Sequence, residues 1–312
     1  MRVLGRYLVP LLACVCCLCV AVPVHAADVK DTTLCYFPDA DGMYTRQQAL
    51  DCLDATQFDA DRASEVVTAL REWFTEEYVF TPYYMDPPGP YDTTPLDLVH
   101  EVQKLGEQTW ESDAAFHIAM RGLVMGLNDP HTRYSPPSCY SQFTFILPGI
   151  YLDTHCTDDL PSECVPEVEV ISSQVTDSMS DLFELYRLSD PTTASAIEGM
   201  YGCRVVSLDG ADPFAEIQSA ADGMGISRDA DNRYNSGTVY QSYVNRSGYT
   251  GNMPLTGSDS VVVEVACDRA NLSVTSSVTI PWLMQLAGDA VYGVEDYHSL
   301  CGLTYTETET EG

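Results

Sequence analysis

The chain has 312 residues and is strongly acidic, because 46 Asp and Glu residues stand against 15 Lys and Arg and give a formal net charge of −31. Nucleic acids and anionic membranes are bound through basic patches that release counterions, so this charge argues against both kinds of partner. Since 45% of the residues are hydrophobic, the chain is still able to bury a core, and its length suggests two domains.

The N-terminus has the pattern of a secretory signal peptide, which we place at residues 1–26. Two arginines precede an almost wholly apolar stretch from Tyr7 to Val20, and Val24-His25-Ala26 fits a small-residue cleavage site. A retained signal anchor is the alternative, because the stretch approaches membrane-spanning length, but its prolines and small residues favour cleavage. We therefore expect a secreted, extracellular protein that begins at Ala27 and has no membrane contact after cleavage.

Eight cysteines follow the predicted signal peptide: Cys35, Cys52, Cys139, Cys156, Cys164, Cys203, Cys267 and Cys301. An even number in an exported chain indicates disulfides, although their connectivity stays open. Thr45-x-x-Gln48 is a capping box that begins a helix carrying Cys52, and the preceding loop is able to fold back on that helix. We therefore expect a disulfide between Cys35 and Cys52.

Cys156 and Cys164 are the second candidate pair. Zinc is an alternative partner for these two residues together with His155. Their spacing matches no common zinc site, however, and an oxidising compartment favours the disulfide. The sequence gives no sign of a bound metal or of another cofactor.

Residues 27–148 are predicted to form a helical N-terminal domain. One helix, opened by Asp59 or Asp61, carries an apolar stripe made of Val66, Val67, Leu70, Trp73 and Phe74. A second helix begins at Thr94-Pro95 and carries a further stripe made of Val99, Val102 and Leu105.

The segment between these two helices is rich in proline and is predicted to be irregular. Its tyrosines, Tyr83, Tyr84 and Tyr91, either line a groove or, as aromatic residues in loops do more often, pack onto the core. His100 and His117 lie at the edges of apolar helical stripes, and we interpret both as structural or surface residues.

A well-formed amphipathic helix is predicted from about Ser112 to Gly126. Apolar residues recur along it at helical spacing: Phe116, Ala119, Met120, Leu123, Val124 and Leu127. The following Asn128-Asp129-Pro130-His131-Thr132 places His131 in a tight turn, where Asp129 is able to orient it. Imidazole exchanges protons near neutral pH, so His131 is a candidate general base. The alternative is a turn histidine that only hydrogen-bonds its neighbours.

After Pro148 the hydrophobic pattern changes to a period of two, which predicts a small, mostly β domain over residues 149–283. Strands are expected around residues 168–170, 203–208, 261–266 and 272–280. Asp209-Gly210 forms a turn, and Asp212-Pro213 begins a short helix. Residues 284–312 are predicted to be a C-terminal tail.

Two glycosylation sequons, Asn245-Arg246-Ser247 and Asn271-Leu272-Ser273, make Asn245 and Asn271 candidate sites if the host modifies them. The acidic run Asp229-Ala230-Asp231-Asn232 invites comparison with a calcium loop. It fails the EF-hand template, because Arg233 stands where an oxygen ligand belongs and no glycine follows.

Several short motifs accompany the Asn-Asp-Pro-His-Thr segment along the chain: Gly202-Cys203-Arg204-Val205-Val206-Ser207-Leu208-Asp209-Gly210, Asp229-Ala230-Asp231-Asn232-Arg233-Tyr234-Asn235 and Pro281-Trp282. In this order they resemble secreted serine peptidases of the tail-specific protease family, in the branch similar to chlamydial protease-like activity factor. The resemblance implies that His131 is the general base of a Ser/His/Glu triad and that residues 149–283 form a PDZ-like domain. It covers most of the mature chain.

The resemblance also implies residues that this sequence does not show. In the family, the nucleophile and the acid lie in a later domain, after a Gly-rich segment that is not found before Gly312. A Ser/Lys dyad does not fit either, because Lys30 and Lys104 both precede His131 without a Ser-x-x-Lys arrangement. The sequence has no Gly-x-Ser-x-Gly elbow, His-Glu-x-x-His helix or Asp-Thr-Gly loop.

We therefore interpret the chain as the N-terminal portion of a secreted serine-type endopeptidase-like protein, with an α+β fold. It carries the base, lacks the nucleophile and is inactive alone, so a peptide or protein substrate requires a separate or downstream catalytic domain. The alternative is a non-catalytic secreted glycoprotein that acts as a peptide-binding or inhibitory module, with His131 in a structural turn. A surface or parasitism-type effector without peptidase ancestry is a third interpretation.

Overall fold

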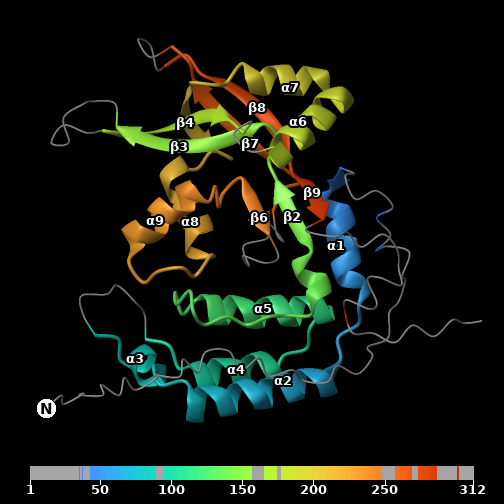
Figure 1. The fold of residues 1–312 in the computed structure, drawn as a ribbon, viewed down its shortest axis with the longest axis vertical. Helices are drawn as coiled ribbons and strands as arrows, with labels where there is room; N and C mark the ends of the chain where they lie inside the picture. The colour runs from blue at the N-terminus through green and yellow to red at the C-terminus, as the bar shows by residue number, and fades with distance from the viewer. Residues whose placement is uncertain are drawn as a thin grey trace, which may run out of the picture.

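The computed structural model (Figure 1) describes residues 35, 37, 43–88, 95–156, 165–173, 177–247, 257–268, 273–286 and 301. The predicted signal peptide and most of the predicted tail lie outside these residues. None of the helices in the described ranges has both the length and the apolar composition needed to span a bilayer.

The N-terminal half of the described chain is mainly helical: it contains α1 (Arg46–Ala55), α2 (Ala60–Glu72), α3 (Thr81–Met85), α4 (Leu98–Gly106) and α5 (Asp113–Met125). A π-helical turn, Trp73–Glu77, continues α2. The capping box predicted at Thr45 and Gln48 is present, with the Thr45 side chain accepting a hydrogen bond from the Gln48 N–H. The predicted helix from Ser112 to Gly126 is α5, whose two caps are these residues.

Two helix starts resolve open points in the sequence. The side chain of Asp59, rather than that of Asp61, caps α2 by accepting hydrogen bonds from backbone N–H groups of its first turn. Helix α4 begins after Asp97, whose carboxylate accepts the His100 N–H. The predicted start at Thr94-Pro95 is therefore too early, because the side chain that satisfies the free N–H groups belongs to Asp97.

Helices α2, α4 and α5 enclose a core of their own, here called the helical core. It consists of Ala63, Phe74, Tyr84, Leu98, Val102, Phe116, Met120, Val124 and Leu127. Within the predicted stripe on α2, Phe74 is fully buried, and the other members are partly buried against this core. The helical layer forms one end of the molecule, and the five-stranded sheet forms the other (Figure 1).

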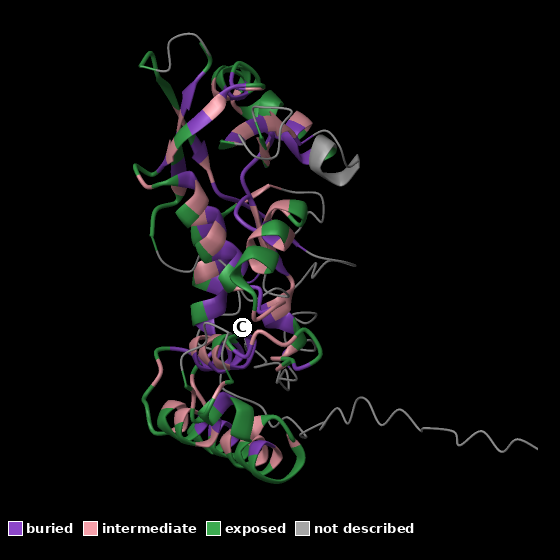
Figure 2. Ribbon diagram, turned by 90° about the vertical axis from the view of Figure 1, so that its left-hand side faces the viewer, coloured by how far each residue is buried: buried purple, intermediate pink, exposed green. Residues whose placement is uncertain are grey.

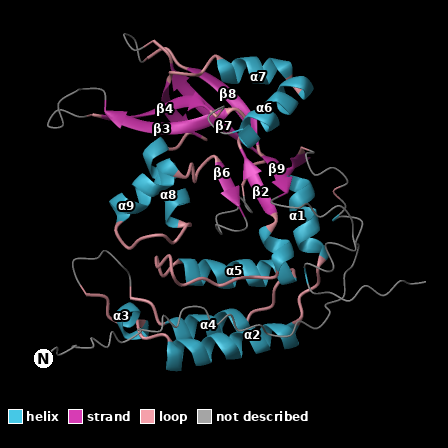
Figure 3. Ribbon diagram, in the orientation of Figure 1, coloured by secondary structure: helices cyan, strands magenta, loops and turns pink. Residues whose placement is uncertain are grey.

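The described strands form two antiparallel sheets, so the predicted α+β class is confirmed (Figure 3). They are β1 (Tyr44–Thr45), β2 (Phe143–Ile146), β3 (Ile150–Cys156), β4 (Pro166–Ser172), β5 (Arg204–Leu208), β6 (Asn245–Ser247), β7 (Ser260–Ala266), β8 (Ser276–Pro281) and β9 (Leu283–Leu286). One sheet has the order β1-β9-β2-β6 and the other β3-β4-β5-β7-β8. The predicted strand regions correspond to β4, β5, β7 and β8.

Residues 149–283 contain more helix than the sequence suggested. The helices are α6 (Asp177–Ser189), α7 (Pro191–Glu198), α8 (Pro213–Asp222) and α9 (Ala230–Val239). Only α8 was expected, and it begins at the predicted Asp212-Pro213 cap. Helix α6 has a helical pattern that the period-two interpretation overlooked, because Leu182, Phe183 and Tyr186 are buried on one side. Helix α9 buries only Gly237, so its sequence carries almost no apolar period.

A larger core, here called the mixed core, joins both predicted domains. It extends from Phe37 and Leu53 through Phe143 and Val263 to Trp282, and Figure 2 shows buried residues along its strands. Strands β1 and β2 pair with β9, so segments on both sides of residue 148 share one sheet.

The C-terminal residues that the structure describes take part in this core. Strand β9 begins at Leu283 and continues past the predicted start of the tail at residue 284. Cys301 is buried and is bonded to Cys139. Residues 284–286 and Cys301 therefore belong to folded structure, and the domain limits drawn from the sequence stay a prediction.

Candidate functional site

The turn that carries His131 is held by the side chain of Asp129. Asn128, just after α5, turns the chain in the left-handed region with a φ of 53°, which asparagine tolerates better than most residues. One Asp129 oxygen then accepts the His131 backbone N–H at 3.0 Å, and the other accepts the Thr132 hydroxyl at 2.6 Å. This is the tight turn that the sequence predicts.

Asp129 is also anchored to the helical layer. The Tyr78 hydroxyl, just after the π-helical turn, donates to Asp129 Oδ2 at 3.2 Å. Burial by itself raises the pKa of the Asp129 carboxyl, but hydrogen bonds from Thr132, His131 and Tyr78 outweigh this effect and hold the pKa below its ordinary value. Asp129 is therefore an anion at neutral pH.

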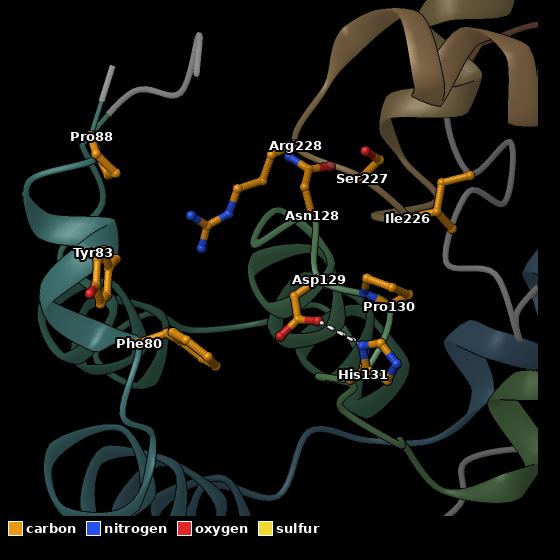
Figure 4. Close-up of a pocket in the computed structure, with 10 residues that line it drawn as sticks. All are labelled: Phe80, Tyr83, Pro88, Asn128, Asp129, Pro130, His131, Ile226, Ser227 and Arg228. Atoms are coloured by element: carbon orange, nitrogen blue, oxygen red, sulfur yellow. Dashed lines mark hydrogen bonds and ion pairs between the residues drawn. The ribbon is translucent and has the colours of Figure 1, made fainter. Parts of the chain in front are cut away.

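The His131 side chain is 92% exposed, and its Nδ1 lies 3.5 Å from Asp129 Oδ1 (Figure 4). Because Nδ1 is turned toward the carboxylate, Nε2 faces away from it. An imidazole oriented in this way is able to accept a proton at Nε2, while the neighbouring anion stabilises the resulting cation. Asp129 thus lies where it is able to orient His131.

His131 lies on the wall of an open hollow of about 680 Å³. The lining residues come from three separate segments: Phe80, Tyr83 and Pro88; Asn128, Asp129, Pro130 and His131; and Ile226, Ser227 and Arg228. Figure 4 shows Phe80 and Tyr83 on one side, the turn with Asp129 and His131 on the other, and the Arg228 guanidinium between them. The hollow thus combines aromatic surface, an imidazole and a guanidinium.

The third of these segments reaches the hollow because of Gly225. Its φ is +61°, and a Cβ at this position would lie 2.3 Å from the carbonyl oxygen of Met125 at the end of α5. A side chain here would push the loop away from the helix, and the left-handed conformation adds strain. Gly225 therefore sets how closely residues 226–228 approach the His131 turn.

Arg228 is held by an aromatic ring. Its guanidinium carbon lies 4.3 Å from the centroid of the Tyr84 ring, which is a cation–π contact. Tyr84 is buried, and its hydroxyl donates to the Leu127 carbonyl at 2.8 Å. Of the two outcomes considered for the tyrosines, Tyr83 lines the hollow and Tyr84 packs into the core, while Tyr91 lies outside the described residues.

The other helical histidines have different surroundings. His117 is buried, and its Nδ1 lies 2.5 Å from the Tyr134 hydroxyl. Its Nε2 lies 3.4 Å from Asp113 Oδ2, an ion-pair distance without hydrogen-bond geometry. His100 is exposed on α4. These positions agree with a structural role for His117 and a surface position for His100.

The residues that were considered as zinc or calcium ligands take part in other interactions. His155 Nε2 lies 3.5 Å from Glu169 Oε2, and Cys156 is disulfide-bonded. Asp229 caps α9 and accepts the Asn232 N–H at 2.7 Å. Within the described ranges, no three potential ligand side chains are grouped closely enough to hold a metal ion.

The described disulfides are Cys35–Cys52, Cys139–Cys301 and Cys203–Cys267. The first is the pair predicted from the sequence. Cys164 lies outside the described residues, so its pairing with Cys156 stays a prediction. Asn245 is half-buried on the edge strand β6, and Asn271 lies outside the described residues.

In the described part of the chain, no serine is hydrogen-bonded to His131. Ser227 lines the same hollow, but its hydroxyl oxygen accepts the Asp229 N–H at 3.2 Å. A base activates a nucleophile only within hydrogen-bond reach. These residues therefore supply a candidate base without a paired serine.

Sequence reasoning missed Arg228 as a member of this site. Its position beside His131 depends on Gly225 and on the buried Tyr84, and neither leaves a local pattern around residue 228. The one available signal was composition, because a basic residue is uncommon in so acidic a chain.

No protein-family model, curated protein or solved structure matches the chain. The resemblance to tail-specific peptidases therefore rests on the short motifs alone, and the site itself has to indicate the function.

Proposed function

We propose that the chain is the N-terminal and PDZ-like portion of an exported serine peptidase of the tail-specific type, with His131 as its general base. The observation that carries the proposal is the position of His131 on the wall of a hollow, exposed and oriented by an anionic Asp129. The three described disulfides support export, because disulfides persist in oxidising compartments. The helix α8 beside antiparallel strands is compatible with a PDZ-like module.

In the proposed reaction, a serine from another domain or chain approaches Nε2 of His131. Nε2 takes the hydroxyl proton as the serine oxygen bonds to the peptide carbonyl carbon, and Asp129 stabilises the imidazolium that forms. His131 then gives this proton to the amine as the C–N bond breaks. Water then attacks the acyl carbon while His131 takes a proton from it. The bond from this carbon to the serine oxygen breaks, His131 returns the proton to that oxygen, and the carboxylic acid product leaves.

The first test concerns the chain without a partner. The protein beginning at Ala27 should not react with an active-site fluorophosphonate or cleave casein above background, because a base without a positioned serine forms no acyl-enzyme. Labelling of any serine in this chain would contradict the proposal that the nucleophile comes from elsewhere.

The second test uses a form that contains the catalytic domain. His131→Ala should lower kcat/KM by about two to four orders of magnitude, the range for loss of a general base. His100→Ala is the matched control, because His100 is an exposed histidine that does not line the hollow, and it should retain full activity. Equal losses in the two variants would mean that His131 has no chemical role.

The alternative is a non-catalytic peptide-binding or inhibitory module. The observation that favours it is the lack of a serine partner for His131 among the described residues. In that case, no form of the protein would have peptidase activity, so His131→Ala would have no activity to lower.

A further inference from the structure

One side of the hollow is an apolar surface, here called the ledge, formed by Phe80 and Tyr83. Their side chains are 48% and 50% exposed, respectively. Their ring centroids lie 6.1 Å apart. Large apolar side chains gathered at the rim of a hollow are typical of a surface that a partner covers.

Arg228 faces the hollow without a carboxylate partner in the described part of the chain. Acidic residues outnumber basic ones by 46 to 15, so a basic side chain readily finds an anion. Several others in the described ranges do so: Arg46, Arg62, Lys104, Arg187, Arg204 and Arg233. Among the described residues, the Arg228 guanidinium interacts with the Tyr84 ring through the cation–π contact. Its N–H donors have no hydrogen-bond acceptor among the described residues.

The acidic residue among those that line the hollow, Asp129, is already engaged. Asp129 accepts hydrogen bonds from Tyr78, Thr132 and the His131 backbone, and its remaining contact is the His131 ring. No ion pair joins it to Arg228, although both line the same hollow. The guanidinium is therefore held in place by Tyr84 and takes no anion from the described residues, so it is available to one that a ligand supplies.

We propose that this hollow binds an extended peptide segment that places a large apolar side chain on the ledge and an Asp or Glu side-chain carboxylate on Arg228. An arginine held against an aromatic ring presents its donors in a fixed fork that matches a carboxylate. The volume of about 680 Å³ suits a few side chains rather than a folded partner.

Other anions fit this site less well. A single guanidinium in a chain of net charge −31 does not offset the several charges of a polyphosphate or a nucleic acid. This proposal rests on the proposed function in one respect: the bound peptide is a substrate only if the protein is part of a peptidase. Binding itself requires neither the serine nor proton transfer by His131.

The test is a binding titration on the protein that begins at Ala27. The probes are N-acetylated, C-amidated peptides that carry one Phe and one Glu at varied spacing, so that terminal charges play no part. Matched peptides replace Glu by Gln or Phe by Ala, and a small aromatic carboxylic acid is titrated separately. We expect the Phe/Glu peptide of best spacing to bind, and either replacement to weaken it about tenfold or more.

The assignment to Arg228 is tested with Arg228→Gln. This variant should weaken binding of the Phe/Glu peptide about tenfold to a hundredfold, the range for a lost charge-assisted hydrogen bond. The variant and the unchanged protein should bind the Gln peptide with similar affinity, because that peptide already lacks the carboxylate that contacts Arg228. Arg71→Gln is the charge-matched control, since Arg71 is exposed on α2 and does not line the hollow. Tyr83→Ala should lower affinity for the Phe peptide but not for the Ala peptide.

Several results would overturn the inference. They are no binding of any peptide in the panel, additive losses from Arg228→Gln and the Gln peptide, an equal loss with Arg71→Gln, or equal affinity for the small aromatic acid. The last would assign the hollow to a small carboxylic acid. The two proposals fail in different experiments. Peptide binding is measured without catalysis, whereas the role of His131 is measured by peptidase activity.

Discussion

The helical core and the mixed core are stabilised in different ways. The three described disulfides each have a cysteine in the mixed core, whereas the helical core contains none. The helical core is instead connected to its loops by hydrogen bonds from tyrosines, such as Tyr84 to the Leu127 carbonyl and Tyr78 to Asp129.

Sequence separation explains this difference. Helices α2 to α5 follow one another, so their packing closes short loops. In the mixed core, β1 pairs with β9 and Cys301 is buried, so its formation closes very long loops at a greater entropic cost. A disulfide offsets part of that cost by constraining the unfolded chain. The hollow draws residues from both regions, and its shape therefore depends on both kinds of stabilisation.

Removal of the longest cross-link should have the largest effect. Replacing both Cys139 and Cys301 by Ser opens a link between residues 162 apart and should lower the free energy of unfolding by about 4–5 kcal/mol. Replacing both Cys35 and Cys52, which are 17 apart, should lower it by about 3 kcal/mol.

Tryptophan fluorescence during urea unfolding distinguishes the two cores. Trp73 and Trp110 pack against the helical core, and Trp282 is in the mixed core. In single-tryptophan variants, loss of the Cys139–Cys301 link should shift the Trp282 transition more than the other two. Coincident shifts at all three would show that the cores unfold as one cooperative unit.

The next largest effect is expected at Asp113, which joins the two cores. It accepts a hydrogen bond from Tyr140 at 2.8 Å and lies 3.4 Å from His117 and 3.9 Å from Arg62. Asp113→Asn leaves buried charged and polar partners without their anion and should lower stability by about 3 kcal/mol at neutral pH. Glu65→Gln, an exposed charge-matched change on α2, should have little effect in the same urea titration.

The pH dependence at Asp113 has a definite sign. Burial by itself raises the pKa of this carboxyl, but His117, Tyr140 and Arg62 outweigh it and the pKa is lowered. A carboxyl with a lowered folded pKa stabilises the protein above its unfolded pKa, about 3.9, and loses this contribution as pH falls toward the folded pKa. Wild-type stability should therefore fall below about pH 4, and Asp113→Asn should flatten that fall. Parallel pH profiles would contradict this.

The smallest effects are expected at helix caps, one in each region. Asp59→Ala removes the cap of α2 at the helical core, and Thr45→Ala removes the capping box of α1 at the mixed core. Each should lower the free energy of unfolding by about 1 kcal/mol. If the cores have separate transitions, Asp59→Ala should act on the Trp73 signal and Thr45→Ala on the Trp282 signal. A reversed pattern would mean that the two cores are assigned wrongly.

The elements that the sequence predicted are those specified by neighbouring residues. The helix from Ser112 to Gly126, the capping box at Thr45 and the helix start at Asp212-Pro213 depend on side chains within a few positions of one another. Helices α6 and α7 were missed although each buries apolar residues, because the change to a period of two was extended over residues 149–283 as a whole. Helix α9 was missed because it buries only Gly237.

The sequence by itself determined the tight turn that carries His131 and the Cys35–Cys52 disulfide, because each needs only residues that are close along the chain. The tertiary structure alone decided the Cys139–Cys301 disulfide, whose partners are 162 residues apart. It also decided that Arg228 faces the hollow beside His131. Such contacts form when packed helices and sheets bring distant segments together, and they impose no period or spacing on the sequence around either partner.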